Sequence, residues 1–182
     1  MQKQIISARQ LNATLERLVC QLVENHKDFS QTALIGIQRR GVILAGKIAQ
    51  ILRRDYGIEN LRLGSLDATF FRDDFRRRSQ MPRANTTSID FPVDNQRVIF
   101  IDDVLHTGRS IRAALSAINS FGRPSQIELL VLIDRRFSRE LPIQPDYRGI
   151  QVDVVEGEKV VVELDEGRQG VSLVLQNTEK QD

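Results

Sequence analysis

Short, continuously apolar segments alternate along this 182-residue chain with segments that have the periodicity of an amphipathic helix. The apolar segments predict buried strands at 32–37, 98–102 and 127–134. Helices are predicted at 7–27, 42–56 and 110–120. Because a strand that is apolar throughout must be covered on both faces, this order predicts an α/β protein with a central parallel sheet and helices on both faces of that sheet.

Local signals at the ends of these segments support the same architecture. Ser7 and Gln10 have the spacing of a capping box at the start of the first helix, and Gly57 can end the second. The alternating segment 61–71 predicts a further strand. Residues 72–96 are polar, include two prolines and have no clear periodicity, so they predict a long functional loop.

The C-terminal part of the chain predicts a small hood on the main body. The segments "IQVDVV" at 150–155 and "KVVVEL" at 159–164 have the pattern of short strands, and the Glu-Gly-Glu between them can join the two as a hairpin. The length fits one domain. We therefore expect a single domain over residues 1–182, with the hood mainly in 140–182.

Composition excludes several classes of protein. Apolar residues make up 41% of the chain, which indicates a globular fold, and no stretch approaches the roughly 20 apolar residues of a membrane span. The N-terminus lacks the apolar core of a signal peptide. Cys20 is the only cysteine, which excludes a disulfide framework and a cysteine-based metal site. We expect a cytoplasmic protein with no membrane partner.

Charge is unevenly distributed along the chain. The net charge is only +2, but the segment from Val152 to Asp182 holds eight acidic and three basic residues, so the rest is clearly basic. Of the 26 basic residues 21 are arginine, whose planar guanidinium binds phosphate through two hydrogen bonds. This favours a polyanionic ligand, although a general bias toward arginine in the source genome would give the same composition.

In an open α/β sheet, ligands bind beyond the carboxyl ends of the strands. Four predicted loops lie at these ends, and they cover 38–41, 67–74, 102–110 and 134–139. All four are rich in arginine, aspartate or glycine. Loops that only reverse the chain do not need this chemistry repeatedly, so the pattern predicts the functional site at this edge of the sheet.

The segment "VIFIDDVLHTGRS" is the most informative of these loops. Asp102 and Asp103 end a strand, and their carboxylates can accept hydrogen bonds from a ribose diol, directly or around a metal ion. Thr107, Gly108 and Ser110 open the next helix, whose free N–H groups can hold a phosphate. A ribose 5-phosphate would satisfy both groups. The alternative is an exposed acidic turn followed by a hydroxyl that only caps the helix.

This segment resembles the phosphoribosyl pyrophosphate (PRPP) signature of type I phosphoribosyltransferases, and "IGIQRRG" resembles their pyrophosphate loop. The segments "DATFFRDD" and "DRRFSRELPIQPDYRG" narrow the resemblance to the PyrR family, whose members combine weak uracil phosphoribosyltransferase activity with RNA-binding control of pyrimidine operons. The resemblance covers about 11–164. It implies the type I phosphoribosyltransferase fold, conversion of uracil and PRPP to UMP and pyrophosphate, and a homodimer or homotetramer.

The resemblance also implies roles for individual residues. Asp102, Asp103 and His106 would be catalytic, and the two aspartates would hold Mg²⁺, mostly through PRPP and water. The PRPP-binding residues would be Arg39, Arg40, Gly41, Asp102, Asp103, Val104, Leu105, His106, Thr107, Gly108, Arg109 and Ser110. A mobile loop that closes over PRPP would include Arg72, Asp73, Asp74 and Arg83. The arginine run at 76–78 either belongs to this function or is a solvated charge run.

His106 bears on the choice of base. Purine-type members of the superfamily carry an aspartate here that can exchange a proton with the purine ring, so a histidine favours uracil and makes a purine phosphoribosyltransferase the weaker alternative. His106 could also be only an exposed loop residue. The segment "PDYRGIQV" resembles the part of related enzymes that places backbone groups around the base. The implied base-binding residues are Arg148, Gly149 and Ile150.

A second alternative is an RNA-binding transcription attenuator that senses UMP or PRPP. In the RNA-binding members that this chain resembles, the first helix carries a Thr-Arg pair and then a histidine three residues further on. Here these positions are Glu16, Arg17 and Cys20, and a glutamate repels RNA phosphates. We therefore expect RNA binding to be weakened. The candidate RNA-binding residues are Arg17, Arg135, Arg136 and Arg139.

Overall fold

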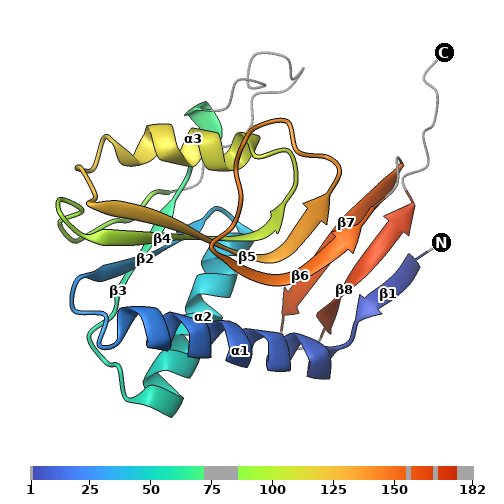
Figure 1. Cartoon of the computed structure of the whole chain (residues 1–182), viewed down its shortest axis with the longest axis horizontal. Coiled ribbons are helices and arrows are strands. Elements are labelled where there is room, and N and C mark those ends of the chain that lie inside the picture. Colours follow the sequence, from blue (N-terminus) through green and yellow to red (C-terminus); the bar gives the residue numbers. More distant parts are fainter. Residues whose placement is uncertain (1, 72–85, 155–156, 166–167, 176–182) are drawn as a thin grey trace.

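A computed structural model describes residues 2–71, 86–154, 157–165 and 168–175 of the chain (Figure 1). These residues form two β-sheets and three α-helices. In the part of the chain that is described, no helix is both long enough and apolar enough to cross a membrane.

The larger sheet has five strands, all parallel, in the order β3-β2-β4-β5-β6. The strands are β2 (Thr32–Ile37), β3 (Arg62–Leu66), β4 (Arg97–Leu105), β5 (Gln126–Arg136) and β6 (Tyr147–Asp153). All six residues of β2 are buried, which explains why its sequence is apolar throughout. This order places the carboxyl ends of β2, β4 and β5 side by side.

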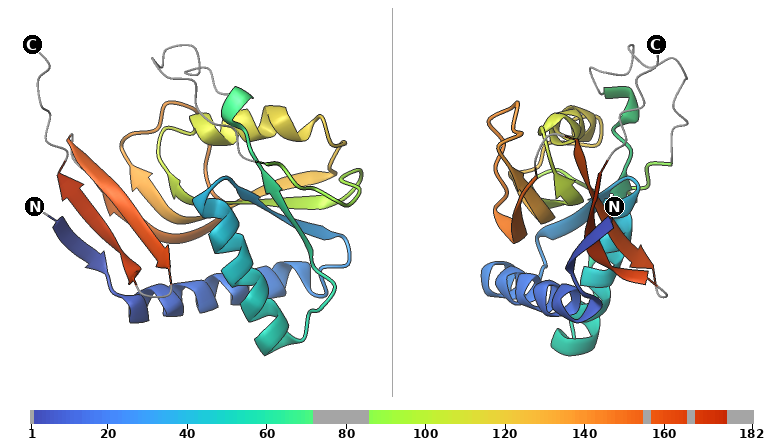
Figure 2. Two further views of the ribbon diagram at one scale, coloured as in Figure 1. Left: turned by 180° about the vertical axis from the view of Figure 1, so that it is seen from behind. Right: turned by 90° about the vertical axis from the view of Figure 1, so that its right-hand side faces the viewer.

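Helices cover both faces of this sheet, as predicted. The helices α1 (Ala8–His26) and α2 (Arg40–Tyr56) lie on one face and α3 (Arg109–Ile118) lies on the other (Figures 1 and 2). The buried leucines of α1 recur every three or four residues and share one hydrophobic core with α2. Ile111 and Ile118 of α3 belong to a second core on the opposite face.

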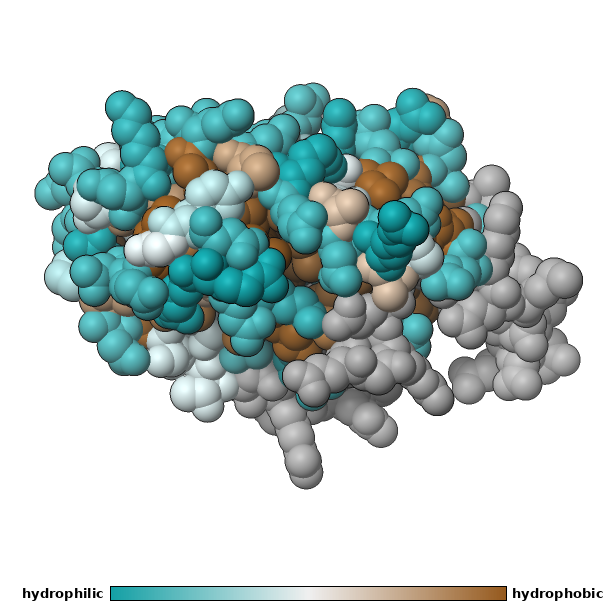
Figure 3. Space-filling view, turned by 90° about the horizontal axis from the view of Figure 1, so that it is seen from below, coloured by the Kyte–Doolittle hydropathy of each residue, from teal (hydrophilic) through white to brown (hydrophobic). Residues whose placement is uncertain are grey.

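The outward surface of the helices is mainly polar. Glu16, Arg17 and Glu24 of α1 are exposed. Figure 3 views the molecule from the side of α1 and α2, and hydrophilic residues predominate on this face, with hydrophobic residues visible between them. The pattern is typical of amphipathic helices that pack on a sheet.

The smaller sheet is antiparallel and joins the two ends of the chain in the order β1-β8-β7 (Figure 1). Its strands are β1 (Gln2–Ile6), β7 (Glu158–Asp165) and β8 (Arg168–Leu175). The predicted hairpin of 150–155 with 159–164 is wrong, because β6 pairs with the edge of β5 and β7 pairs with β8. Alternating strands of this kind fit either sheet, so the sequence pattern does not choose their partners.

The predicted element boundaries are mostly confirmed. Ser7 caps α1 with both hydrogen bonds of a capping box, and Gly57 ends α2 in the left-handed conformation with φ of 64°. The predicted strand 61–71 is wrong in its second half, since β3 ends at Leu66 and Thr69–Phe71 forms a 3₁₀ turn, η1. There the backbone N–H of Thr69 donates to a side-chain oxygen of Asp67 at 2.8 Å, which turns the chain.

Candidate active site

The candidate site lies at the carboxyl ends of β2, β4 and β5, where the loops that follow these strands meet. A cavity of about 650 Å³ opens there. Four of its lining residues were predicted to bind PRPP, and they are Arg40, Asp103, Val104 and His106. The others are Arg135, Phe137, Ser138, Val154, Gly157, Glu158, Lys159 and Val160.

The two aspartates at the end of β4 have different environments. Asp102 is only 9% exposed, and its Oδ1 accepts a hydrogen bond of 2.9 Å from the backbone N–H of Asp103. Asp103 lines the cavity, and its Oδ2 lies 3.6 Å from Nη1 of Arg40. Asp103 therefore faces the cavity beside a cation from the β2–α2 loop, whereas Asp102 is buried behind it.

A glycine lets α2 begin close to the acidic pair. A Cβ atom on Gly41 would lie 2.2 Å from the backbone oxygen of Ile101, which is far inside contact distance. Only glycine permits this approach between the first turn of α2 and the end of β4. The peptide bond between Gln38 and Arg39 is cis, and α2 starts at Arg40. The close approach at Gly41 places Arg40 beside Asp103.

A glycine turn begins α3. Gly108 occupies the N-cap position of α3 with φ of 93°, a conformation that favours glycine. The hydroxyl of Thr107 accepts a hydrogen bond of 3.3 Å from the backbone N–H of Arg109. Gly108 therefore occupies the N-cap position, and the hydroxyl of Thr107 binds the first N–H group of the helix. The first N–H groups of a helix and its dipole favour a bound phosphate.

Glu140, which sequence analysis did not single out, pairs with a predicted PRPP-binding residue. Its Oε2 lies 2.5 Å from Nε of Arg109, and both side chains are partly exposed. The backbone N–H of Glu140 also donates to the carbonyl oxygen of Thr107 at 3.0 Å. The loop after β5 is therefore attached to the turn before α3.

His106 lies in a positively charged part of the cavity. Partial burial and the nearby guanidinium of Arg135 lower the pKa of His106 below its usual value, and Arg139 adds to this effect. Glu140 acts in the opposite direction but does not prevail. The imidazole of His106 is therefore neutral at pH 7.

The predicted base-binding residues do not line this cavity. Arg148 lines a second cavity, of about 420 Å³, and Gly149 and Ile150 lie beside it in β6. On the first cavity, Arg135 has a buried Nε atom that lacks a hydrogen-bond partner among the described residues, and the same holds for the Oγ atom of Ser138.

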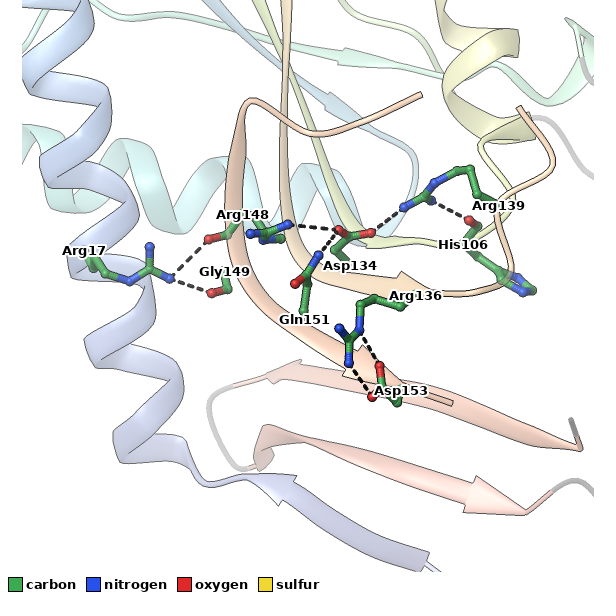
Figure 4. A network of polar contacts seen from close by, with 9 residues as sticks. All are labelled: Arg17, His106, Asp134, Arg136, Arg139, Arg148, Gly149, Gln151 and Asp153. Carbon is green, nitrogen blue, oxygen red and sulfur yellow. Dashed lines mark hydrogen bonds and ion pairs between the residues drawn. The ribbon is translucent and has the colours of Figure 1, made fainter. Parts of the chain in front are cut away.

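The four candidate RNA-binding arginines lie in α1, at the end of β5 and in the loop after it, and three of them are drawn in Figure 4. Arg17 donates to the backbone oxygens of Arg148 and Gly149 at 3.2 and 2.6 Å. Arg136 makes two hydrogen bonds of 2.5 Å to Asp153. The side chains of Arg136 and Arg139 also contact the second cavity. Arg139 pairs with Asp134 and with the backbone of His106.

The predicted mobile loop lies largely outside the described residues. This holds for Arg72, Asp73, Asp74 and Arg83, and for the arginine run at 76–78. The returning part of the segment is described, and Ser88 forms an isolated antiparallel bridge with Ser65 of β3. Ser88 therefore lies at the outer edge of the larger sheet, next to β3.

Several residues that line the first cavity were not predicted from the sequence, because the tertiary fold and not a local motif brings them there. Phe137 has φ of 65° and is 86% exposed, and it contacts both cavities. Val154 and Gly157 come from the connection between the two sheets, and Lys159 lies at the start of β7. Their only sequence signal is the glycine between two predicted strands. By contrast, Asp134 and Arg135 could be found from their place at the end of an apolar strand.

The donor set of the site suits a magnesium ion that is shared with a substrate. Among the described residues there is no group of three or more histidine, cysteine or acidic side chains that could hold a metal ion by itself. Asp102 and Asp103 supply two carboxylates at the end of β4. Mg²⁺ characteristically uses one or two carboxylates and completes its shell with water and substrate phosphates, so the residues present fit this ion.

Comparison with known proteins identifies relatives over most of the chain. A family model described as "Phosphoribosyl transferase domain" matches residues 1–166. The chain is 44% identical over 164 residues to "Bifunctional protein PyrR" of Caldicellulosiruptor bescii, which covers 90% of this chain and 89% of the relative. It is 38% identical over 181 residues to the protein of the same name from Elusimicrobium minutum, which covers 98% of this chain and 100% of the relative.

Solved structures share the fold at low sequence identity. The chain is similar to HGPRT-ase from Leishmania tarentolae in complex with GMP, with a TM-score of 0.71, 14% identity and 97% of each chain covered. Its likeness to the hypoxanthine phosphoribosyltransferase of Trypanosoma cruzi has a TM-score of 0.71 at 13% identity, over 96% of this chain and 97% of that one. These similarities confirm the predicted fold, and at such identities they carry no information on the base.

Proposed function

The chain belongs to the phosphoribosyl transferase domain family and, within it, to the PyrR family, and from this premise we propose that it transfers the phosphoribosyl group of PRPP to uracil. One observation carries the proposal. Arg40 lies in the first turn of α2, Asp103 lies near the end of β4 and His106 directly follows that strand, and all three line one cavity beside the glycine turn that starts α3. This arrangement places acidic and basic side chains and the N-terminus of a helix around a space that can hold a sugar with a phosphate and a pyrophosphate group.

In the proposed complex, the N-terminus of α3 binds the 5-phosphate of PRPP. Asp102 and Asp103 accept hydrogen bonds from the ribose hydroxyls, and Arg39 and Arg40 neutralise the pyrophosphate. The phosphate groups are assigned to positive charge and the neutral hydroxyls to the carboxylates, since the acidic pair would repel the phosphates and the helix N-terminus attracts them. The negative charge of the aspartates also stabilises positive charge that develops on the ribose as its bond to pyrophosphate breaks.

The proposed reaction forms a bond between N1 of uracil and the ribose C1 atom, while the bond from C1 to the pyrophosphate oxygen breaks. The electron pair of that bond leaves with pyrophosphate, and the N1 proton of uracil must be lost. A neutral His106 on the cavity wall can accept this proton, because its lowered pKa keeps it unprotonated at pH 7. Arg135 also lines the cavity, and its guanidinium would donate to a carbonyl oxygen of the base.

Magnesium fits this proposal as the cofactor, and Asp102 and Asp103 would hold it together with PRPP and water. When bound, the ion would neutralise the charge on the departing pyrophosphate. Arg40, which lies beside Asp103, would share that task.

The test is a base panel with PRPP and Mg²⁺, in which UMP formation from uracil is compared with nucleotide formation from hypoxanthine and guanine. We expect uracil to be converted and the purines to be inert. Faster turnover of hypoxanthine would overturn the pyrimidine assignment.

A double variant, Asp102→Asn with Asp103→Asn, should abolish transfer and PRPP binding in calorimetry while it still unfolds cooperatively. Asp55→Asn removes an exposed carboxylate of α2 and serves as the matched control.

A second candidate function is RNA-binding regulation, and two observations favour it. The relatives are named bifunctional, which indicates a role besides catalysis. Arg136, Arg139 and Arg148 also line the second cavity, which lies away from Asp103 and Arg40. Under this proposal the transferase site would serve mainly to sense UMP or PRPP.

A further inference from the structure

The segment 137–143, here called the strap, lies against the turn that begins α3. The backbone N–H groups of Glu140 and Leu141 both donate to the carbonyl oxygen of Thr107, at 3.0 and 3.2 Å. A Cβ atom built on Gly108 would lie 3.3 Å from side-chain atoms of both Leu141 and Ile143, so the strap is in contact with that glycine. The strap therefore packs on the turn and is hydrogen-bonded to it.

Arg139 of the strap points toward Asp134 of β5 and the backbone of His106 (Figure 4). Its Nη1 donates to the carbonyl oxygen of His106 at 2.5 Å, and its Nη2 donates to Oδ1 of Asp134. The side chain of Arg139 is 23% exposed and that of Asp134 is 6% exposed. A guanidinium has donors in a rigid plane, so the carboxylate that holds one nitrogen also fixes the direction of the other.

Asp134 is itself held by two further residues. Its Oδ2 accepts a hydrogen bond of 3.3 Å from Nε2 of Gln151, and Nη1 of Arg148 lies 3.6 Å away. Both partners belong to β6, the strand next to β5 in the larger sheet. The carboxylate that orients Arg139 is therefore anchored to the sheet and not to a loop.

The strap holds two successive carbonyl groups of the turn, those of His106 and Thr107. A trans peptide unit is planar, and its N–H points away from its C=O. When Arg139 holds the His106 carbonyl, the N–H of Thr107 must point away from the strap. The same argument directs the N–H of Gly108 away from the strap, because the Thr107 carbonyl is bound to Glu140 and Leu141.

We propose that Arg139, oriented by Asp134, is a positioning residue that fixes the peptide planes of the PRPP turn so that their N–H groups face the phosphate. Arg139 does not line the first cavity, so it acts through the backbone of His106 and not by touching the substrate. This inference rests on the proposed function in one respect, since PRPP is taken as the ligand of the turn.

The test compares Arg139→Ala with Arg62→Ala, a matched control in which another arginine also donates to a backbone carbonyl. Arg62 binds the oxygen of Ser30 at 2.6 Å, at the other end of the sheet. Loss of one charge-assisted hydrogen bond predicts roughly a tenfold weaker affinity for PRPP in Arg139→Ala, measured by calorimetry and as the KM for PRPP. The KM for uracil should not change, and the melting temperature of Arg139→Ala should equal that of Arg62→Ala.

Two further variants keep the test decisive if Arg139→Ala does not fold. Arg139→Lys retains the charge but cannot hold two acceptors in a fixed geometry, so it should restore PRPP affinity only in part. Asp134→Asn should weaken PRPP binding in the same direction, because a neutral amide orients the guanidinium less strongly. Wild-type affinity in both of these variants would overturn the inference.

The outcomes also separate this inference from the proposed function. A wild-type protein that binds PRPP but transfers it to no base would contradict the proposed function alone, and the calorimetric comparison would still decide the role of Arg139. Arg139→Ala that binds PRPP as tightly as Arg62→Ala would contradict the positioning role alone. A wild-type protein that does not bind PRPP would overturn both.

Discussion

His106 shows how a single side chain acquires its properties from neighbours that are distant in sequence. It follows β4 directly, but the charges around it come from the end of β5 and from the loop after β5. Partial burial disfavours the imidazolium, and Arg135 and Arg139 act in the same direction. The same residue in an exposed loop would titrate near its ordinary value, so the lowering of its pKa follows from the fold and not from the local sequence.

We predict that His106 titrates below 6.5 in an NMR titration of the imidazole resonances. The chain has only two histidines, and His106→Gln identifies the resonance by its loss. Arg135→Gln should raise the pKa of His106, because it removes the nearest positive charge that lowers it. Arg136→Gln is the control, since this adjacent arginine is not among the charges that act on His106.

The lowered pKa of His106 also determines how the free energy of unfolding depends on pH. Between the folded-state pKa and about 6.5, the unfolded chain binds more protons than the folded one at this site. The free energy of unfolding should therefore decrease as pH falls through this range, and His106→Gln should reduce that dependence. A titration midpoint at or above 6.5 would contradict the assignment of the charges around His106.

At the scale of elements, α2 carries a matched pair of glycines with opposite roles. Gly41 begins the helix against the backbone of β4, where a Cβ atom would lie 2.2 Å from the oxygen of Ile101. Gly46 lies one and a half turns further on, and a Cβ atom there would have nothing within 4 Å. One glycine is therefore required by packing, and the other only adds flexibility to the unfolded chain.

We predict that Gly41→Ala lowers the free energy of unfolding by about 1–3 kcal/mol, because a backbone oxygen cannot move aside for the new methyl group. The same variant should weaken PRPP binding, since the displaced helix start carries Arg40. Gly46→Ala should raise the free energy of unfolding by about 0.5–1 kcal/mol. Urea denaturation of both variants measures these changes, and equal effects at the two positions would contradict the close approach at Gly41.

The elements also show what the sequence could and could not predict. The strand 32–37 was predicted with its observed bounds, because a strand buried on both faces is apolar at every position. The approach of Arg40 and Asp103 was also predictable, since Arg40 follows β2, Asp103 lies near the end of β4, and parallel strands end at one edge. β1 was not predicted and β7 was given the wrong partner, because the pairing of short alternating strands depends on tertiary contacts.

At the scale of the whole molecule, the two ends of the larger sheet have different polar chemistry. At the end opposite the cavity, His26 forms hydrogen bonds with Thr32 and Glu128, and Tyr147 donates to Glu128 at 2.7 Å. Burial and the bond to Glu128 raise the pKa of the Tyr147 hydroxyl. These side chains are satisfied by one another, which is typical of a structural network.

The carboxyl end of the sheet gathers arginines instead, but most of those proposed for RNA already bind groups of the protein. Arg17 binds two carbonyl oxygens of β6, and Arg136 binds both carboxylate oxygens of Asp153. Arg139 binds Asp134 and the backbone of His106. An RNA phosphate would have to compete with these partners. Fewer arginines are therefore available to RNA than their number in the sequence suggests.

We therefore predict that the chain binds a pyrimidine-leader hairpin weakly and with a shallow salt dependence. Each phosphate neutralised contributes about 0.7–0.9 to the salt slope, and Glu16 beside Arg17 opposes such contacts. The measurement is a titration of the hairpin at several salt concentrations, with and without UMP. Glu16→Thr with Cys20→His, which restores the pattern of the RNA-binding relatives that the sequence resembles, should strengthen binding and steepen the slope.

Nanomolar binding by the wild-type chain that UMP strengthens would contradict this prediction and make regulation the primary function. Binding that salt abolishes, and that depends neither on UMP nor on the RNA sequence, would indicate only the attraction of a basic protein to a polyanion.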